Sequence, residues 1–187
     1  MLRPPDSFKT TRLTLRRLEP QDDELIFAAY AQDPEVTKYL TWRPHRTVAD
    51  TKAFVEGRIN AWDAGTEFVW TILLNGSRLI GGIALRLQDC KADVGYVIAR
   101  PHWGHGYAPE ALGALVQWAL AQPAIHRVWA VCDIDNPKSA RVMEKVGMIR
   151  EGILRRWVFH PQAGSEPRDC LCYSIIKEGC TGPADGG

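Results

Sequence analysis

The chain has 187 residues, of which 45% are hydrophobic and 24% are charged, a size and composition that suit one folded domain with a substantial core. Its 23 Lys and Arg residues against 22 Asp and Glu residues leave a formal charge of +1. There is therefore no overall positive field to attract nucleic acid or an anionic membrane. The start lacks the pattern of an export signal, and no window has the roughly 20 apolar residues of a spanning helix. We expect a cytoplasmic protein without nucleic-acid or membrane partners.

The cysteines and the composition along the chain also bear on its organisation. The five cysteines are odd in number and scattered, so we expect reduced, mostly buried thiols rather than a disulfide or a zinc site. Repeats, low-complexity blocks and linkers are absent from the sequence. We expect a flexible start over residues 1–10, one domain over residues 11–178, and a disordered polar tail over residues 179–187.

The first third of the chain predicts a strand followed by two helices. Residues 11–18 alternate apolar and polar side chains, as a half-buried strand does. Residues 21–32 carry apolar side chains at helical spacing between two prolines. Thr47 and Asp50 have the spacing of a capping box, with Asp in place of the usual Glu or Gln. They indicate the start of a helix whose apolar side includes Trp62.

A meander of three strands is expected next. Residues 68–74 and 78–87 predict two strands joined by Asn75-Gly76, the dipeptide that best tolerates positive φ in a two-residue turn, and residues 92–98 add a third. A helix, a strand, a helix and two closing strands follow over residues 108–121, 126–132, 139–146, 148–158 and 169–176. This order predicts an α/β fold of the α+β type, with a mixed, mostly antiparallel sheet and helices on both faces.

Two glycines separated by one residue, Gly104 and Gly106, lie where this meander leads into the next helix. The first N–H groups of a helix lack intrahelical partners and lie at the positive end of its dipole. A glycine-rich entry can therefore form a cradle for phosphate groups. A tight turn without a ligand is the alternative for so short a motif. A dinucleotide-binding loop would have a third glycine where this chain has Pro109, and the nucleoside-triphosphatase motif is absent.

The surrounding sequence carries a more specific likeness. Residues 95–111, GYVIARPHWGHGYAPEA, resemble the acetyl-CoA-binding motif of the GNAT superfamily of N-acyltransferases. Residues 135–147 resemble the N-x-x-S-x-x-V-x-E-K-x-G segment of its RimJ/RimL-type branch, named for enzymes that acetylate the N-termini of ribosomal proteins. Similar runs lie at residues 12–16, 39–44 and 151–155, so the likeness covers about residues 13–177. It implies the GNAT fold and transfer of an acetyl group from acetyl-CoA to a primary amine.

The resemblance also implies which residues hold acetyl-CoA. The pantetheine arm would pair with exposed strand backbone, and Asn136 would reach a pantetheine amide, although Asn and Ser are also ordinary helix-entry residues. The superfamily usually opens the loop with Gln or Arg at the position of Pro101, so one phosphate contact is missing here or comes from Arg100. The implied cofactor residues are Val97, Ile98 and Ala99 on the strand, Trp103, Gly104, His105, Gly106, Tyr107 and Ala108 in the loop, and Asn136 and Ser139 beyond it.

The chemistry requires a neutral amine to attack a thioester, and a chain-terminal amine has a pKa of about 7.7 to 8.0. The amide N–H near Ile98 would polarise the thioester carbonyl. Many superfamily members protonate the departing thiolate with a Tyr where this chain has Met143, so the resemblance assigns that catalytic role to Ser139. Asp93 and Glu110 are the candidate catalytic bases, although Glu110 also suits a helix N-terminus.

The acceptor site is defined less well by the sequence. Trp42, Glu67, Trp70 and Arg86 come from segments that would flank it, although a Trp is more often part of a core or a rim. The acceptor would be a protein N-terminus or a small amine such as a polyamine, an amino acid or an antibiotic. The resemblance suggests a homodimer, and we expect no metal. Two other interpretations remain open: a catalytically silent acyl-CoA-binding module that regulates a partner, and a nucleotide-binding protein of another fold.

Overall fold

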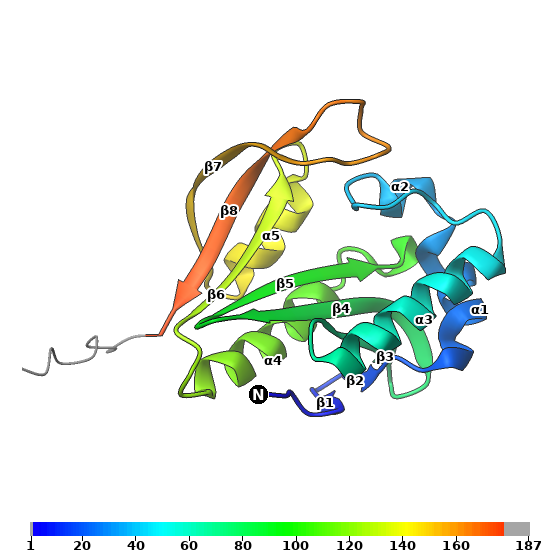
Figure 1. Ribbon diagram of the computed structural model, residues 1–187, viewed down its shortest axis with the longest axis horizontal. Coiled ribbons are helices and arrows are strands. Elements are labelled where there is room, and N and C mark those ends of the chain that lie inside the picture. The colour runs from blue at the N-terminus through cyan, green and yellow to red at the C-terminus, as the bar shows by residue number, and fades with distance from the viewer. Residues whose placement is uncertain (1, 178–187) are drawn as a thin grey trace, which may run out of the picture.

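The structure, a computed structural model, describes residues 2–177. Its centre is one eight-stranded sheet with the strand order β1-β2-β3-β4-β5-β6-β8-β7 (Figure 1). Neighbouring strands are antiparallel except β5 and β6, which run parallel. Helices lie over both faces of the sheet. The predicted fold class is therefore confirmed.

The boundaries of the elements follow the sequence patterns closely. The strands are β1 (Ser7–Lys9), β2 (Leu13–Arg17), β3 (Phe68–Leu74), β4 (Arg78–Gln88), β5 (Lys91–Ile98), β6 (Arg127–Asp133), β7 (Ile149–Val158) and β8 (Arg168–Ile176). The helices and helical turns are η1 (Pro20–Asp22), α1 (Asp23–Ile26), η2 (Phe27–Ala31), α2 (Pro34–Thr37), α3 (Val48–Ala64), η3 (Arg100–His102), α4 (Tyr107–Ala121) and α5 (Pro137–Lys145).

Two local signals in the sequence act as expected. The side chain of Thr47 accepts a hydrogen bond from the N–H of Asp50, and the Asp50 carboxylate accepts one from the N–H of Thr47. This capping box satisfies N–H groups that would otherwise lack partners at the start of α3. At the β3–β4 turn, Asn75 and Gly76 both have positive φ, 51° and 75°, as the central residues of a type I′ turn do. Leu74 pairs with Arg78, so Ser77 adds a third residue to the two that the sequence predicts for this loop.

Other segments differ from the expectation. Residues Ser7–Lys9, within the start that was expected to be flexible, form β1 against β2, because the ring of Phe8 packs edge-on against Trp70. The helix expected over residues 21–32 is divided into η1, α1 and η2, the last of which is a π-helical turn. The expected tail over residues 179–187 lies outside the described residues.

The helices form two layers around the sheet. Leu112 and Leu115 of α4 pack into a core cluster with apolar residues from β2 to β6 on one face, and α5 lies on this face too. On the other face Ile26 of α1, Tyr30 of η2 and Val55 of α3 form a second cluster with residues of β3 and β4. The α3 side covers mainly the early strands, whereas α5 packs against β6, β7 and β8. β7 is the last strand in the order and forms one edge of the sheet (Figure 1).

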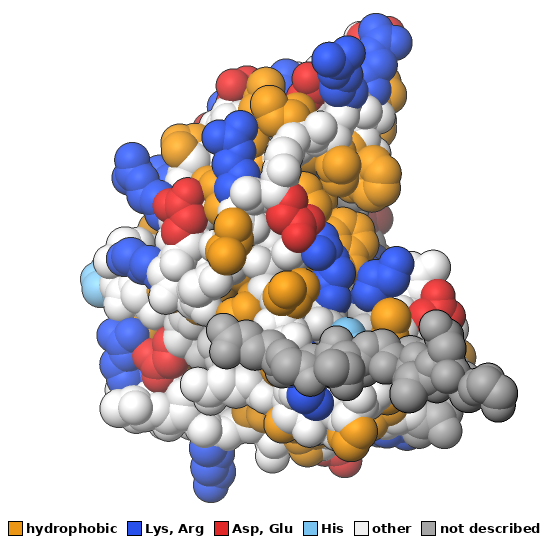
Figure 2. All heavy atoms as spheres, turned by 90° about the vertical axis from the view of Figure 1, so that its left-hand side faces the viewer, with side chains coloured by type: hydrophobic (Ala, Val, Ile, Leu, Met, Phe, Trp, Pro, Cys, Tyr) orange, Lys and Arg blue, Asp and Glu red, His pale blue; other side chains and the backbone are white. Residues whose placement is uncertain are grey.

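The surface beside β7 and β8 mixes apolar and charged side chains. Figure 2 looks onto this side of the molecule and shows hydrophobic side chains among Lys, Arg, Asp and Glu. Ile149, Ile153 and Trp157 of β7 contribute exposed apolar area, with Ile149 73% exposed. Among the described residues, none of the helices combines the length and the apolar character needed to cross a membrane.

Candidate functional site

The sheet opens between its two parallel strands. β5 pairs with β6 only through Lys91–Asp93, which face Arg127–Trp129. Beyond these residues the two strands diverge (Figure 1). β5 follows β4 to Ile98 and β6 follows β8 to Asp133. Because no described strand pairs with the facing edges beyond this point, backbone groups there are free to receive an extended ligand as an added strand. We call this opening the β5–β6 gap.

The direction of the backbone groups corrects part of the expected cofactor set. The N–H of Ala99 donates to Ile80 O of β4 at 2.8 Å, so it faces away from the gap. Backbone groups alternate in direction along a strand, so those of Val97 face β4 as well. Tyr96 and Ile98 direct theirs to the gap. The indole N–H of Trp103 already donates to Ile98 O at 2.6 Å, which leaves the Ile98 N–H as the group available there.

The glycine loop has a backbone conformation that depends on its two glycines. Gly104 and Gly106 have φ values of 80° and 81°, a region that other residues rarely adopt. A Cβ on Gly104 would meet no atom within 4 Å, so the space beside it is open. Gly106 is the N-cap of α4, and no side chain of the described residues caps that helix. The loop thus offers first-turn N–H groups at the positive end of a helix dipole.

Two cations lie beside this loop, and the sequence did not single out either of them for that place. Arg12, immediately before the start of β2, donates from Nη1 to His105 O at 3.0 Å and lies over the ring of Tyr107. Lys138, in the first turn of α5, places its ammonium 4.5 Å from the centre of the Trp103 ring. Lys138 adds positive charge close to a predicted anion cradle, whereas the guanidinium of Arg12 is paired with the Glu110 carboxylate at 2.6 Å. Arg12 reaches the loop through contacts with residues far away in sequence, such as Glu110, which is 98 residues further along the chain. Only the folded structure could reveal that contact.

The position of Glu110 contradicts its proposed role as a base. Its carboxylate accepts hydrogen bonds from the Thr10 hydroxyl at 2.6 Å and from the Arg12 backbone and side chain at 2.9 and 2.7 Å. Burial favours the neutral acid, but these hydrogen bonds outweigh it and lower the pKa of Glu110 below its ordinary value. Glu110 anchors the start of β2 to α4 and thereby supports the loop.

The histidines of the loop are held by the loop itself. His105 Nδ1 lies 2.8 Å from Trp103 O, and its ring stacks on Tyr107. Burial, followed by the charges of Arg78 and His105, lowers the pKa of His102. A neutral His102 near pH 7 adds no positive charge for phosphate groups.

On the face covered by α4 and α5, Ser139 lies beside the gap. Asn136 is the N-cap of α5 and accepts a hydrogen bond from the N–H of Ser139, which confirms the helix-entry role considered for it. The Ser139 hydroxyl lies 2.8 Å from the hydroxyl of Tyr96 on β5. It also interacts with buried Cys132 of β6, whose pKa burial raises to about 12. A neutral thiol and two hydroxyl groups therefore meet where β5 and β6 have separated.

The opposite face carries a row of charged residues that runs from the residue before β3 across β4 to β5. The guanidinium of Arg86 lies 2.6 Å from Glu67 Oε1 and 2.5 Å from Asp93 Oδ2. Arg58 makes a second ion pair with Glu67, which is buried. Asp93 belongs to the last pair before the strands diverge. It lies three residues before Tyr96, about 10 Å along the strand and on the other face. The structure therefore does not bring Asp93 next to Ser139.

The expected acceptor residues fall into different environments. Trp70 is fully buried: it packs edge-on against Trp62 and Phe8, and its indole donates to Pro5 O. Trp70 therefore belongs to the core, and its assignment to the acceptor site is wrong. Trp42 is half-buried beside His45 in an aromatic group on the face of the Arg86 row.

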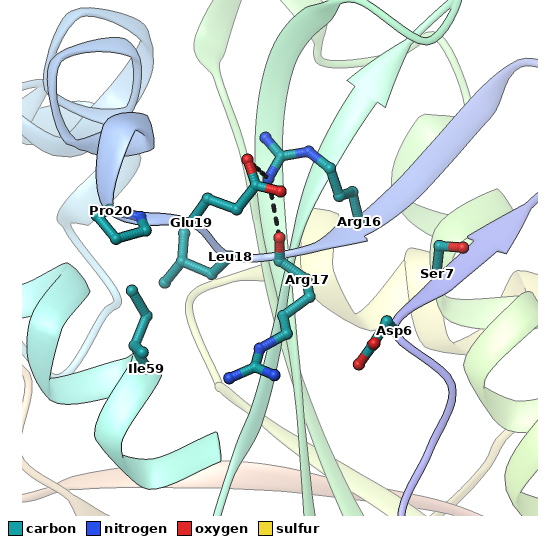
Figure 3. Close-up of a pocket in the computed structure, with 8 residues that line it drawn as sticks. All are labelled: Asp6, Ser7, Arg16, Arg17, Leu18, Glu19, Pro20 and Ile59. Atoms are coloured by element: carbon teal, nitrogen blue, oxygen red, sulfur yellow. Dashed lines mark hydrogen bonds and ion pairs between the residues drawn. The ribbon is translucent and has the colours of Figure 1, made fainter. Parts of the chain in front are cut away.

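A depression elsewhere on the surface is separate from these features. It has a volume of about 470 Å³ and lies between β1, β2, η1 and α3, with Arg16 and Glu19 paired inside it (Figure 3). β2 is three strands from β5, about 14 Å across the sheet. No residue of the gap or of the glycine loop lines it. The arrangement of chemical groups, rather than this concavity, identifies the candidate site.

The remaining cysteines agree with the sequence-based expectation as far as the structure describes them. Cys132, Cys170 and Cys172 are buried and free, and Cys90 is exposed and free. Cys180 lies outside the described residues.

Comparisons with known proteins agree with this geometry. The family model described as the acetyltransferase (GNAT) domain matches residues 12–149. YoaA of Bacillus subtilis strain 168, named as an uncharacterised N-acetyltransferase, is 32% identical, and the match covers 90% of this chain and 96% of YoaA. The crystal structure of a GNAT-family acetyltransferase from Bacillus anthracis is 31% identical with a TM-score of 0.79, over 92% of this chain and 99% of that one. RimL, a ribosomal L7/L12 α-N-protein acetyltransferase solved with coenzyme A, shares the fold at 20% identity and a TM-score of 0.78, over 89% and 95% of the chains.

The same class of protein is indicated by the family model, which matches most of the chain, by the splayed parallel strands and by the glycine loop. The chain belongs to the GNAT family of acetyltransferases. It is accordingly an N-acetyltransferase, as its curated relatives are named.

Proposed function

We propose that the protein transfers an acetyl group from acetyl-CoA to a primary amine by direct attack of the amine on the thioester. The observation that carries this proposal is the β5–β6 gap, which lies between the glycine loop and the Ser139 hydroxyl. Three features match three parts of one ligand. The open strand edge suits the pantetheine arm, the anion cradle suits the diphosphate, and the proton donor suits the thioester.

The loop and Lys138 would hold the diphosphate. The N–H groups from Gly104 to Ala108 would donate to it, with Gly104 permitting its close approach. The N–H of Trp103 is taken out of the expected set, because it already donates to Arg100 O at 3.2 Å. Lys138 would replace the charge that a basic residue at the position of Pro101 supplies in other members, because the charge of Arg12 is paired with Glu110. The pantetheine arm would pair with the backbone of Tyr96 and Ile98, and the side-chain N–H₂ of Asn136 would donate to a pantetheine carbonyl.

The residues at the end of the arm would carry the chemistry. The Ile98 N–H would stabilise charge on the thioester oxygen. As the C–S bond breaks, the Ser139 hydroxyl gives its proton to the departing sulfur, and the serine oxygen receives the proton that the amine nitrogen loses. An α-amine with a pKa of about 7.7 to 8.0 is substantially neutral near pH 8, so a weak base such as water suffices. Asp93, paired with Arg86 at the closed end of the gap, is not assigned this role.

The acceptor would enter from the face that carries Trp42, Arg86 and Glu67. The likeness to RimL favours a protein N-terminus, and a small amine is the other acceptor class that the site admits. A catalytically silent acyl-CoA-binding module is the alternative function, since Glu67, Asp93 and Glu110 are all engaged in ion pairs.

Thermal stability and thiol release test the proposal together. Saturating acetyl-CoA at about 100 times its Kd should stabilise the fold by about 2.7 kcal/mol, which raises Tm by roughly 5 to 10 °C for a chain of this size. ATP and NAD serve as controls and should leave Tm unchanged. Thiol release with N-terminal peptides, polyamines or amino acids would name the acceptor class. Binding without release would favour the silent module, and absence of any shift with acetyl-CoA would refute the donor assignment.

We also propose a cytoplasmic homodimer. The free thiols among the described cysteines suit a reducing compartment. Ile149, Ile153 and Trp157 leave apolar area on the edge strand β7, and such an edge is commonly covered by a partner. Light scattering should give twice the chain mass, and Trp157→Gln should shift the population towards the monomer. A monomer at every concentration tested would contradict the dimer.

A further inference from the structure

Tyr96 is a residue of the gap that the proposed chemistry does not yet use. It lies on β5, beyond the last residue paired with β6. Its side chain points to the face of α4 and α5, opposite to Asp93. The phenol thus connects one side of the gap, β5, with Ser139 on the other side, in the first turn of α5.

The hydrogen bonds of this phenol involve two oxygens of the same residue. The Tyr96 hydroxyl lies 3.0 Å from the Ser139 carbonyl oxygen and 2.8 Å from Ser139 Oγ. A phenol has one proton to donate, and a carbonyl oxygen only accepts. When the phenol donates to the carbonyl, the serine proton is directed to the phenol oxygen. When the phenol donates to Oγ, the serine proton is released from that contact and can be directed elsewhere.

We propose that Tyr96 is a positioning residue that turns the Ser139 proton towards the departing sulfur of the donor by donating its own hydrogen bond to Ser139 Oγ. This inference rests on the proposed function, because it assumes that Ser139 is the proton donor. Tyr96 keeps its proton throughout, so no additional proton acceptor is needed. The hydrogen bond also stabilises charge that develops on the serine oxygen as its proton leaves.

The electrostatic environment suits this role. Burial raises the pKa of Tyr96, and the hydrogen bond with Ser139 only partly opposes that effect. The phenol therefore stays protonated, and remains a hydrogen-bond donor, over the whole range in which an amine acceptor becomes neutral. A group that stays protonated orients its neighbour without adding an ionisation of its own to the pH profile.

Tyr96 also packs against the core cluster, so its role could be structural only. In that case, removing its hydroxyl would not lower kcat specifically through Ser139. The variant Tyr96→Phe keeps the ring and removes only the hydroxyl. Tyr173 of β8 provides a matched control: it is buried, and its hydroxyl donates to Glu144 Oε1 at 2.8 Å on α5. Tyr173→Phe removes the same atom from a buried tyrosine whose hydroxyl bonds to Glu144 instead of Ser139.

The test compares kcat and KM of the whole enzyme with acetyl-CoA and its best acceptor. Tyr96→Phe should lower kcat about tenfold, or about 1.4 kcal/mol, with KM for acetyl-CoA unchanged, and Tyr173→Phe should leave both parameters unchanged. In a Ser139→Ala background, Tyr96→Phe should have no further effect on kcat. The inference is overturned if Tyr96→Phe retains full kcat, or if it lowers kcat equally with and without Ser139. If Ser139→Ala itself retains full kcat, the proton-donor assignment fails instead.

Discussion

Ser139 shows how much of the proposed chemistry depends on a single hydroxyl. Its backbone is held by the N-cap bond to Asn136, and its hydroxyl contacts Tyr96. Removal of the hydroxyl therefore leaves the helix entry intact and changes only the proton donor.

We expect Ser139→Ala to lower kcat about 100-fold while KM for acetyl-CoA changes little, because a general acid acts only in the transition state. Thiol release under saturating donor measures both quantities. Ser77→Ala, in the β3–β4 turn, is the matched control and should keep wild-type kinetics. A Ser139→Ala enzyme with an undiminished kcat would show that another group protonates the sulfur.

Individual residues are also where the sequence was least informative. The sequence pattern located the two loop glycines, because their positive φ depends on local backbone. The catalytic role of Ser139 is implied by the family resemblance and stays a prediction. The pattern failed for Glu110 and Trp70, because their partners come from distant segments, Thr10 and Arg12 in one case and Pro5 and Phe8 in the other. Long-range pairing decides whether a carboxylate is free or an indole is exposed, and spacing along the chain does not report it.

At the scale of elements, the entry to α4 depends on backbone that only glycine adopts easily. Gly104→Ala would place a side chain at φ 80°, which costs about 1–2 kcal/mol, and would fill open space beside the loop. We expect acetyl-CoA affinity to fall about tenfold or more, as measured by isothermal titration.

Gly57 of α3 supplies the control for this prediction. A Cβ there also meets no atom within 4 Å, but Gly57 lies in a helix interior. Gly57→Ala should stabilise the fold by about 0.5–1 kcal/mol with donor affinity unchanged. Equal affinity of the two variants for acetyl-CoA would argue against a phosphate-binding role for the loop.

The pairing of β6, β8 and β7 includes a carboxylate that responds to pH. A hydrogen bond with Arg127 of β6, followed by one from Ser174 of β8, lowers the pKa of Glu151 from 4.5 to about 2. A carboxylate whose pKa is lower in the folded state than in the unfolded state stabilises the fold at pH values above the unfolded-state pKa. This contribution is lost as the pH falls from about 4.5 to about 2.

Comparison with a variant reveals this contribution. Glu151→Gln should have a lower Tm than the wild type near pH 7. The difference in Tm should shrink near pH 3, because Glu151 of the wild type is then largely protonated in the unfolded state. Because the side chain is 40% exposed, solvent screening keeps the effect small. Glu56→Gln, on the exposed side of α3, controls for the loss of a surface charge. A Tm difference that does not vary with pH would contradict the predicted linkage.

The predicted elements matched the structure wherever a period or a capping signal was strong. α3 begins at the capping box, and the β3–β4 turn forms at Asn75 and Gly76. β1 was missed because three residues carry too short a pattern, and its stability comes from Phe8 packing on Trp70. The π-helical turn of η2 was missed because its apolar spacing does not differ visibly from that of an α-helix.

For the whole molecule, the gap gives acetyl-CoA a structural effect that can be measured without turnover. The strand edges over residues 94–98 and 130–133 lack a described pairing partner between them. Amide exchange there should slow when acetyl-CoA binds, because the arm accepts and donates hydrogen bonds as an added strand would. Exchange in β2 and β3 should not change. Equal slowing across the whole sheet would indicate general stabilisation rather than occupation of the gap.

Under the proposed function, the open gap also limits which molecules can serve as donors. Its closed end is fixed by the pairing of Asp93 with Trp129, and the glycine loop follows the far end of β5. If the proposed donor site is correct, a thioester would lie beside Ser139 only when its other end reaches the loop at the same time. A short acetyl thioester without the diphosphate has the same reactive bond but would be too short to make both contacts. We therefore expect the protein to select donors by molecular length before any chemistry begins.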